Sequence, residues 1–180
     1  MSDARPDDVL LAAAAAGDDA AFATLVRRYI RQATLLAAQL VGDADDAEDV
    51  AQDAFTVVHR DAARFEQGRP FAPWCFAIVR RLAANRRARA ARRARLMQLW
   101  RPAPVSTPSH EDAALSRVDA GALMRVVAHL PPMQRACFEL VVIRELSAEE
   151  AAAMHGIAES TVRQHVFRAR AALKEAFGND

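Results

Sequence analysis

The chain has 180 residues, a length that fits one domain or two small ones. Hydrophobic residues make up 52% of it, enough to bury a core, which argues against a wholly disordered chain. The net charge is +1, but its distribution is uneven: residues 1–60 carry 5 basic and 11 acidic side chains, residues 61–101 carry 11 and 2, and residues 102–180 carry 8 and 10. An acidic block followed by a basic one indicates two unlike partners.

The amino-acid composition limits the fold classes and the cellular locations that are expected. The chain contains 42 Ala and 23 Arg, which are strong helix formers, and only 6 Gly, so a β-sandwich or barrel is not expected. There is no apolar run of about 18 residues, and residues 1–4 include Asp3 but no basic residue, so we expect neither a membrane span nor a signal peptide. The two cysteines, Cys75 and Cys137, form no motif, which favours a reduced, cytoplasmic location.

Gly, Pro and acidic residues divide the chain into predicted helices. In the first half these cover about residues 9–16, 18–41, 44–63 and 74–95. Residues 101–112 contain three prolines and no helical periodicity, which is typical of a flexible linker. Beyond the linker, four helices are expected. The first ends at Pro131, and the others cover about residues 133–144, 147–155 and 159–177. The sequence thus predicts an all-α protein with domains at 1–95 and 113–180, joined by a linker over 96–112.

The last two predicted helices have the pattern of a helix-turn-helix. Ser147 and Glu150 have capping-box spacing, and Gly156 provides the turn. In the final helix, apolar residues share one face, while the opposite face carries Arg, Gln and Phe167. Arg and Gln pair with guanine and adenine edges in the major groove, and an apolar side chain can meet a thymine methyl. The alternative is a helical hairpin with solvated arginines and with Phe167 packed against a neighbour.

The basic block forms one predicted helix that follows Pro73. An apolar stripe, which includes Trp74 and Ile78, accompanies eight arginines from Arg80 to Arg95. This density of positive charge is repulsive unless a polyanion binds, which favours nucleic acid over a merely solvated face. The aromatic residues that flank the region are candidates for stacking on unpaired bases, although each is a candidate core residue too. They are Phe65, Phe71, Trp74 and Phe76.

The acidic block places Asp45, Asp49 and Asp53 at successive turns of one predicted helix. Like charges at this spacing destabilise a helix, so a basic protein surface or a metal ion is the expected partner. A calcium loop beginning at Asp43 is rejected, because Glu48 replaces the required Gly and Ala54 the bidentate Glu. The chain also lacks catalytic constellations, metal-ligand spacing and phosphate-binding glycine motifs, so we expect neither an enzyme nor a cofactor.

Four ordered motifs give the chain its resemblance to a family. They cover residues 46–55, residues 71–74 with Ile78, residues 130–135 and residues 156–170. With them the chain resembles sigma factors of the extracytoplasmic-function (ECF) subfamily of the sigma-70 family. The resemblance implies a subunit that binds core RNA polymerase and directs initiation at promoters through their −10 and −35 elements. The implied partners are the β′ clamp and β flap of the polymerase, promoter DNA and an anti-sigma factor.

The resemblance also implies three sets of site residues. The set matching the segment that docks on the basic β′ clamp is Asp46, Glu48, Asp49, Gln52, Asp53 and Phe55. The set matching the segment that recognises and melts the −10 element is Trp74, Arg80, Arg81, Asn85 and Arg86. Within it, Asn85 matches a position that contacts a flipped-out base, and Arg81 replaces an Asn common in the family. The set matching the −35 reading helix is Ser160, Thr161, Arg163, Gln164, Phe167 and Arg168.

Two other functions stay open on the residues alone. A stand-alone helix-turn-helix regulator would bind duplex operators, but it has no need of the acidic stripe. A helical adaptor would use both charged patches for contacts with proteins. Binding to core polymerase and selection from a promoter library distinguish these possibilities.

Overall fold

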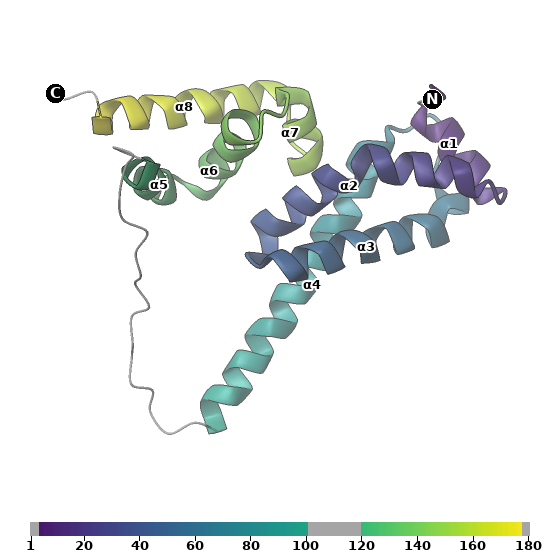
Figure 1. The fold of residues 1–180 in the computed structure, drawn as a ribbon, viewed down its shortest axis with the longest axis horizontal. Helices are drawn as coiled ribbons and strands as arrows, with labels where there is room; N and C mark the ends of the chain where they lie inside the picture. The colour runs from purple at the N-terminus through teal and green to yellow at the C-terminus, as the bar shows by residue number, and fades with distance from the viewer. Residues whose placement is uncertain (1–3, 101–119, 178–180) are drawn as a thin grey trace. The chain divides into compact units, whose positions relative to one another are not determined.

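A computed structural model describes residues 4–100 and 120–177 of the chain (Figure 1). The described residues form helices and no strand, as the composition predicts. The chain folds into two compact units, with the main division after Arg93. Of the predicted linker over 96–112, residues 96–100 continue the helix that precedes it, and residues 101–112 lie outside the described residues.

The first unit is built from four helices. These are α1 (Asp7–Ala15), α2 (Asp19–Val41), α3 (Ala44–Asp61) with the short 3-10 turn η1 (Ala62–Arg64), and α4 (Phe71–Trp100). Helices α2 and α3 pack side by side, α1 packs on α2, and α4 extends well beyond the other three (Figure 1). The core of this unit includes Leu25, Leu36, Val50, Val58 and Val79, all at most 2% exposed.

The helix boundaries follow local chemistry. Asp18 and Asp43 cap α2 and α3, each accepting a 2.9 Å hydrogen bond from a backbone N–H three residues on. Gly42 ends α2 at φ +81°, where a residue without a Cβ is favoured. Helix α4 begins at Phe71, before the predicted start at Trp74, because Pro73 still falls in the first turn, where no intrahelical N–H bond is lost. The helix also continues past Arg95 to Trp100.

Aromatic and charged contacts hold the N-terminal part of this unit together. Arg28 and the hydroxyl of Tyr29 both donate hydrogen bonds to the carboxylate of Asp7, which ties α1 to α2. Burial and the neighbouring Asp7 raise the pKa of Tyr29 well above its usual value. The Tyr29 ring also lies 5.1 Å from that of Phe71, so the start of α4 packs on α2.

The second unit contains α5 (Ala120–His129), α6 (Pro132–Phe138), the π-helical segment η2 (Glu139–Ile143), α7 (Ala148–His155) and α8 (Glu159–Phe177). Helices α5 and α6 both pack on α8, around a core that includes Val127, Leu130, Phe138 and Ala169. Helix α5 ends just before the prolines at 131 and 132, as predicted. The bounds of α7 and α8 also agree with the predicted helices over 147–155 and 159–177.

The helix predicted over residues 133–144 is present over Pro132–Ile143, but its last five residues are π-helical and not α-helical. Helix α6 ends at Phe138, and the next residues form a wider turn, in which the Arg144 N–H donates to the Glu139 carbonyl at 2.9 Å. Leu140 within this turn and Leu146 just after it are both buried.

Candidate interfaces for nucleic acid and protein

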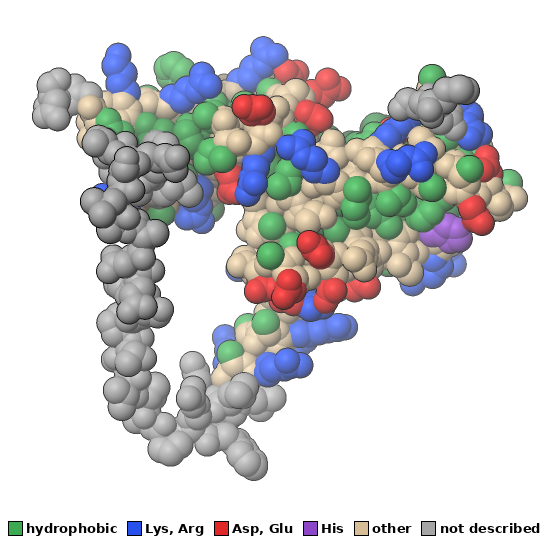
Figure 2. Space-filling view, viewed as in Figure 1, with side chains coloured by type: hydrophobic (Ala, Val, Ile, Leu, Met, Phe, Trp, Pro, Cys, Tyr) green, Lys and Arg blue, Asp and Glu red, His purple; other side chains and the backbone are tan. Residues whose placement is uncertain are grey.

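The predicted protein-binding residues all lie on α3: Asp46, Glu48, Asp49, Gln52, Asp53 and Phe55. Four of them form, together with Asp45, what we call the acidic face: Asp45, Asp46, Glu48, Asp49 and Asp53. Figure 2 shows acidic side chains gathered along one edge of α3. All but Asp46 are classed as exposed, and the opposite side of the helix is buried through Ala47, Val50, Ala51, Ala54 and Val58. Apart from Asp46, the side chains of the acidic face are therefore open to solvent.

Two members of the acidic face already have a partner inside the first unit. Arg86 of α4 donates from Nε to Asp46 Oδ1 at 2.9 Å, and its Nη2 donates to the same oxygen and to Asp49 Oδ2, the latter at 3.0 Å. The hydrogen bonds to Asp46 and, to a smaller extent, to Asp49 raise the pKa of the Arg86 guanidinium. Glu48 and Asp53 have no ion pair with any residue that the structure describes. The sequence did not predict that Arg86 pairs with Asp46 and Asp49.

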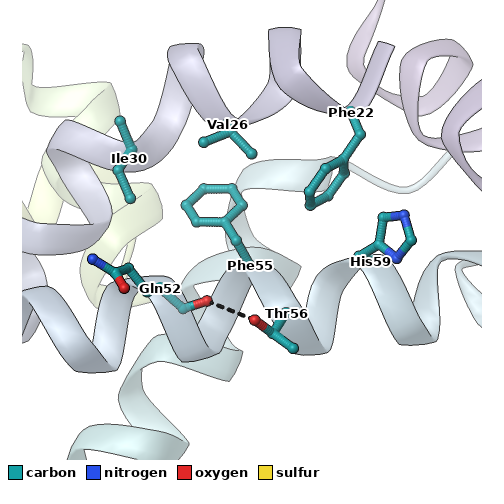
Figure 3. A pocket seen from close by; sticks show the side chains of 7 residues that line it. All are labelled: Phe22, Val26, Ile30, Gln52, Phe55, Thr56 and His59. Carbon is teal, nitrogen blue, oxygen red and sulfur yellow. Dashed lines mark hydrogen bonds between the residues drawn. The ribbon is translucent and has the colours of Figure 1, made fainter. Parts of the chain in front are cut away.

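Phe55, predicted to bind the same partner, lies in the core and is only 5% exposed. Its ring packs edge-on against Phe22 of α2, with centroids 6.5 Å apart. It forms the floor of an open groove between α2 and α3, whose other walls are shown in Figure 3. The seven lining residues are Phe22, Val26, Ile30, Gln52, Phe55, Thr56 and His59. Phe22, Val26 and Ile30 follow one another at intervals of four residues, so they form an apolar row along α2. This spacing is the signal in the sequence that could have indicated the groove.

The predicted −10 residues are distributed along α4. Arg81 and Asn85 are exposed one turn apart, whereas Arg86 turns toward α3. Arg80 directly precedes Arg81, and Trp74 near the helix start is half-buried, with its ring 5.0 Å from that of Phe65. Arginines then continue to Arg95, and Figure 2 shows basic side chains along this end of the helix.

The suggestion that four aromatics stack on bases is wrong for two of them. Phe71 and Phe76 are each 2% exposed, because both pack against Tyr29. Only Phe65 and Trp74 keep part of their surface in solvent. Within this cluster, they are the remaining candidates for contact with an unpaired base.

Helices α7 and α8 form the predicted helix-turn-helix. The capping box is present: the Ser147 N–H donates to Glu150 Oε2 at 2.8 Å, and the Glu150 N–H donates to Ser147 Oγ at 3.1 Å. Gly156 makes the turn at φ +68°. Helix α8 buries Val162, Val166 and Ala169 against its own unit.

The predicted base-reading residues lie on the opposite side of α8. Most are exposed, with Thr161 half-buried; the set is Ser160, Thr161, Arg163, Gln164, Phe167 and Arg168. Arg163 pairs with Glu159 one turn earlier at 2.5 Å. Phe167 is 73% exposed, so the alternative in which it packs against a neighbour is wrong.

We searched the described residues for a metal site, a membrane-spanning helix and a reactive cysteine. No group of three or more His, Cys, Asp or Glu side chains there is arranged to hold a metal ion. None of the described helices combines the length and apolar character that crossing a bilayer requires. Cys75 is fully buried, and this burial raises the pKa of its thiol to about 12, which favours the protonated form.

Comparison with known proteins places both units in one family. Residues 25–93 match the family model for Sigma-70 region 2, and residues 120–173 match that for Sigma-70, region 4. The ECF RNA polymerase sigma factor SigM of Mycobacterium tuberculosis is 36% identical over 176 residues, which cover 97% of this chain and 86% of SigM. The RNA polymerase sigma factor CnrH of Cupriavidus metallidurans is 30% identical over 189 residues, covering 100% of this chain and 98% of CnrH.

Solved structures agree with the sequence matches. The structure of CnrH in complex with the cytosolic domain of CnrY has a TM-score of 0.58 and 28% identity, covering 97% of this chain and 98% of that one. The sigma factor RpoE in complex with the anti-sigma factor NepR from Bartonella quintana has a TM-score of 0.52 and 25% identity, covering 88% of this chain and 98% of that one. The chain therefore belongs to the ECF subfamily of the sigma-70 family, and it is a sigma factor that directs promoter-specific transcription initiation.

Proposed function

We propose that the three sets of residues divide the work of this sigma factor among α3, α4 and α8. The acidic face of α3 docks on the basic β′ clamp of core RNA polymerase, α4 acts on the −10 element, and α8 reads the −35 element. The observation that carries the proposal is the segregation of charge: acidic side chains are exposed along α3, and basic ones are exposed along α4 and α8. A basic protein and a polyanion each find one complementary surface.

The docking surface on α3 extends into the groove beside it. Gln52 lines the groove and is exposed next to Asp53, so a single partner helix that lies along α3 reaches both. The buried position of Phe55 gives it a supporting role: its ring holds α2 against α3 and shapes the groove floor. We assign polymerase contact to Glu48, Gln52 and Asp53 first, with Asp46 and Asp49 shared with Arg86.

On α4 and α8 the DNA contacts differ in kind. Arg81 and Asn85 are both exposed on α4. There Asn85 contacts a base that has been taken out of the stack, and Arg81 and its neighbouring arginines bind phosphate. Arg163, Gln164 and Arg168 are arranged to read base edges of duplex DNA. Region 2 is assigned to residues 1–95, the linker to 96–112, with α4 continuing into its first five residues, and region 4 to 113–180. The protein works in the cytoplasm, without a catalytic site, cofactor or metal of its own, and an anti-sigma factor is its regulatory partner, as NepR is for RpoE.

The docking assignment is tested by reversing one charge. Asp53→Arg places a positive charge against the basic clamp surface, and we expect a loss of about 2–5 kcal/mol in binding to core polymerase. Glu175→Arg makes the same charge change at an exposed position of α8 and serves as the matched control. Affinity is measured by titrating labelled protein with core polymerase, and helicity by circular dichroism. Undiminished core binding by folded Asp53→Arg contradicts the assignment.

A further inference from the structure

Arg86 occupies an unusual place on α4. Cys75, Val79 and Ala83 are all fully buried and lie one turn apart on the face that packs into the first unit. The next residue on that face is Arg86, and there the apolar stripe ends. Its guanidinium reaches across to α3 and bonds both Asp46 and Asp49.

The other arginines of this face make no such contact. Arg89 and Arg93 line the same hollow beside Asp46, yet neither has an ion pair to a carboxylate of the described residues. The hollow is polar and open to solvent, so its charges are accessible to a competing partner. Arg86 thus makes a specific contact in a neighbourhood where the general charge is shared by several arginines.

The contact uses two of the carboxylates that a basic partner would need. Arg86, Asp46 and Asp49 side chains are 37%, 35% and 59% exposed, so the ion pair is reached by solvent and is weak. Planar guanidinium bonds to carboxylates are also the bonds that a basic polymerase surface would offer. Glu48 and Asp53, which pair with no described residue, remain to attract the partner first.

We propose that Arg86 is an intramolecular competitor for the acidic face, which core polymerase displaces from Asp46 and Asp49 when it binds. The proposal rests on the docking function assigned above. Displacement releases a guanidinium next to Asn85, on the helix assigned to the −10 element, where it becomes available to a DNA phosphate. Because the two events share one contact, polymerase binding favours DNA binding, and DNA binding favours polymerase binding to the same degree.

A permanent strut is the rival explanation. In that case Arg86 holds α4 on α3 in every state, and removing it loosens α4 without exposing a useful charge. Competition predicts tighter polymerase binding when Arg86 is neutralised, and a strut predicts equal or weaker binding. The two explanations therefore differ in the sign of one measured change.

The test compares Arg86→Gln with the matched control Arg89→Gln, which removes the same charge from the same hollow. We expect Arg86→Gln to bind core polymerase about two- to fivefold more tightly than wild type, the effect of an exposed ion pair. Arg89→Gln should change the affinity less. In an Asp46→Asn/Asp49→Asn background, Arg86→Gln should bring no gain, since the competed carboxylates are gone.

Arg86→Lys keeps the charge but loses the planar fork, so its affinity should lie between wild type and Arg86→Gln. Weaker core binding by both Arg86→Gln and Arg86→Lys would overturn competition in favour of the strut. Unchanged binding by Arg86→Gln, together with loss of binding by Asp53→Arg, would overturn the inference and leave the docking function standing. Core binding that Asp53→Arg leaves intact would instead refute the docking function itself.

Discussion

Phe167 shows how a single side chain separates function from folding. Its surface is 73% exposed on a helix whose opposite face is buried, so it contributes little to the hydrophobic core. An exposed aromatic between Arg163, Gln164 and Arg168 fits apolar contact with a thymine methyl beside hydrogen-bonded base edges. Substitutions on this side of α8 should therefore change DNA binding without unfolding the domain.

The Arg163 side chain provides the sharpest test at this scale. Arg163→Ala should cost about 1–3 kcal/mol of −35 binding and reduce discrimination between the preferred duplex and a mutated one. Arg170→Ala, at an exposed position outside the assigned set, should weaken binding to both duplexes alike if it binds phosphate. Gel-shift titrations at fixed salt measure the two ratios. An unchanged sequence preference in Arg163→Ala would show that the reading position lies elsewhere on α8.

At the residue scale, the sequence shows which side of a helix a residue lies on, but not which residues of different helices meet. The phase of α8 predicts that Phe167 is on the polar side, and the structure confirms it. Phe55 has the phase of a buried residue, yet the family motif drew it into the binding set. The contact of Arg86 with Asp46 joins residues 40 positions apart, and its formation depends on how α4 crosses α3, which no local pattern specifies.

At the scale of elements, stop and start signals account for most boundaries. Gly42 and Gly156 end helices in the left-handed region, and Asp18, Asp43 and Ser147 cap the helices that they precede. The π-helical segment η2 was not predicted, because apolar residues at 140–143 satisfy an α-helical pattern as well. The sequence pattern alone does not distinguish the wider turn from an α-helical one.

Two caps make a matched pair for a pH experiment. The backbone N–H of Ala21, and with it Arg5, lowers the pKa of Asp18 below its usual 3.8, so its ionised form stabilises the fold. That stabilisation is fully present above the unfolded pKa and is lost as pH falls through the folded pKa. The destabilisation caused by Asp18→Ala should therefore be largest near neutral pH and shrink as pH falls below about 4.

Ser147 carries no titratable group, and Ser147→Ala should cost about 0.5–2 kcal/mol with little dependence on pH. Urea unfolding followed by circular dichroism at several pH values gives both free energies. An Asp18→Ala effect that stays constant down to about pH 3 would mean that the carboxylate does not stabilise α2 through its charge.

On the scale of the whole molecule, the chain is nearly neutral, but its charges are divided between an acidic surface and basic ones. A net charge of +1 gives no sign of nucleic-acid binding, whereas the exposed acids of α3 and the exposed arginines of α4 and α8 each match one partner. Fold class and function were predictable from sequence because the four motifs and the helix signals agree. The groove between α2 and α3 was not, since it forms only when two helices pack.

The central claim is that α4 opens the promoter while α8 reads duplex DNA and α3 holds the polymerase. Permanganate footprinting of unpaired thymines tests it most directly, with holoenzyme reconstituted from wild type or Asn85→Ala on several promoters. The account predicts that Asn85→Ala keeps core binding and −35 duplex binding but loses most of the thymine reactivity at the −10 element. Equal reactivity for Asn85→Ala and wild type on every promoter would contradict it.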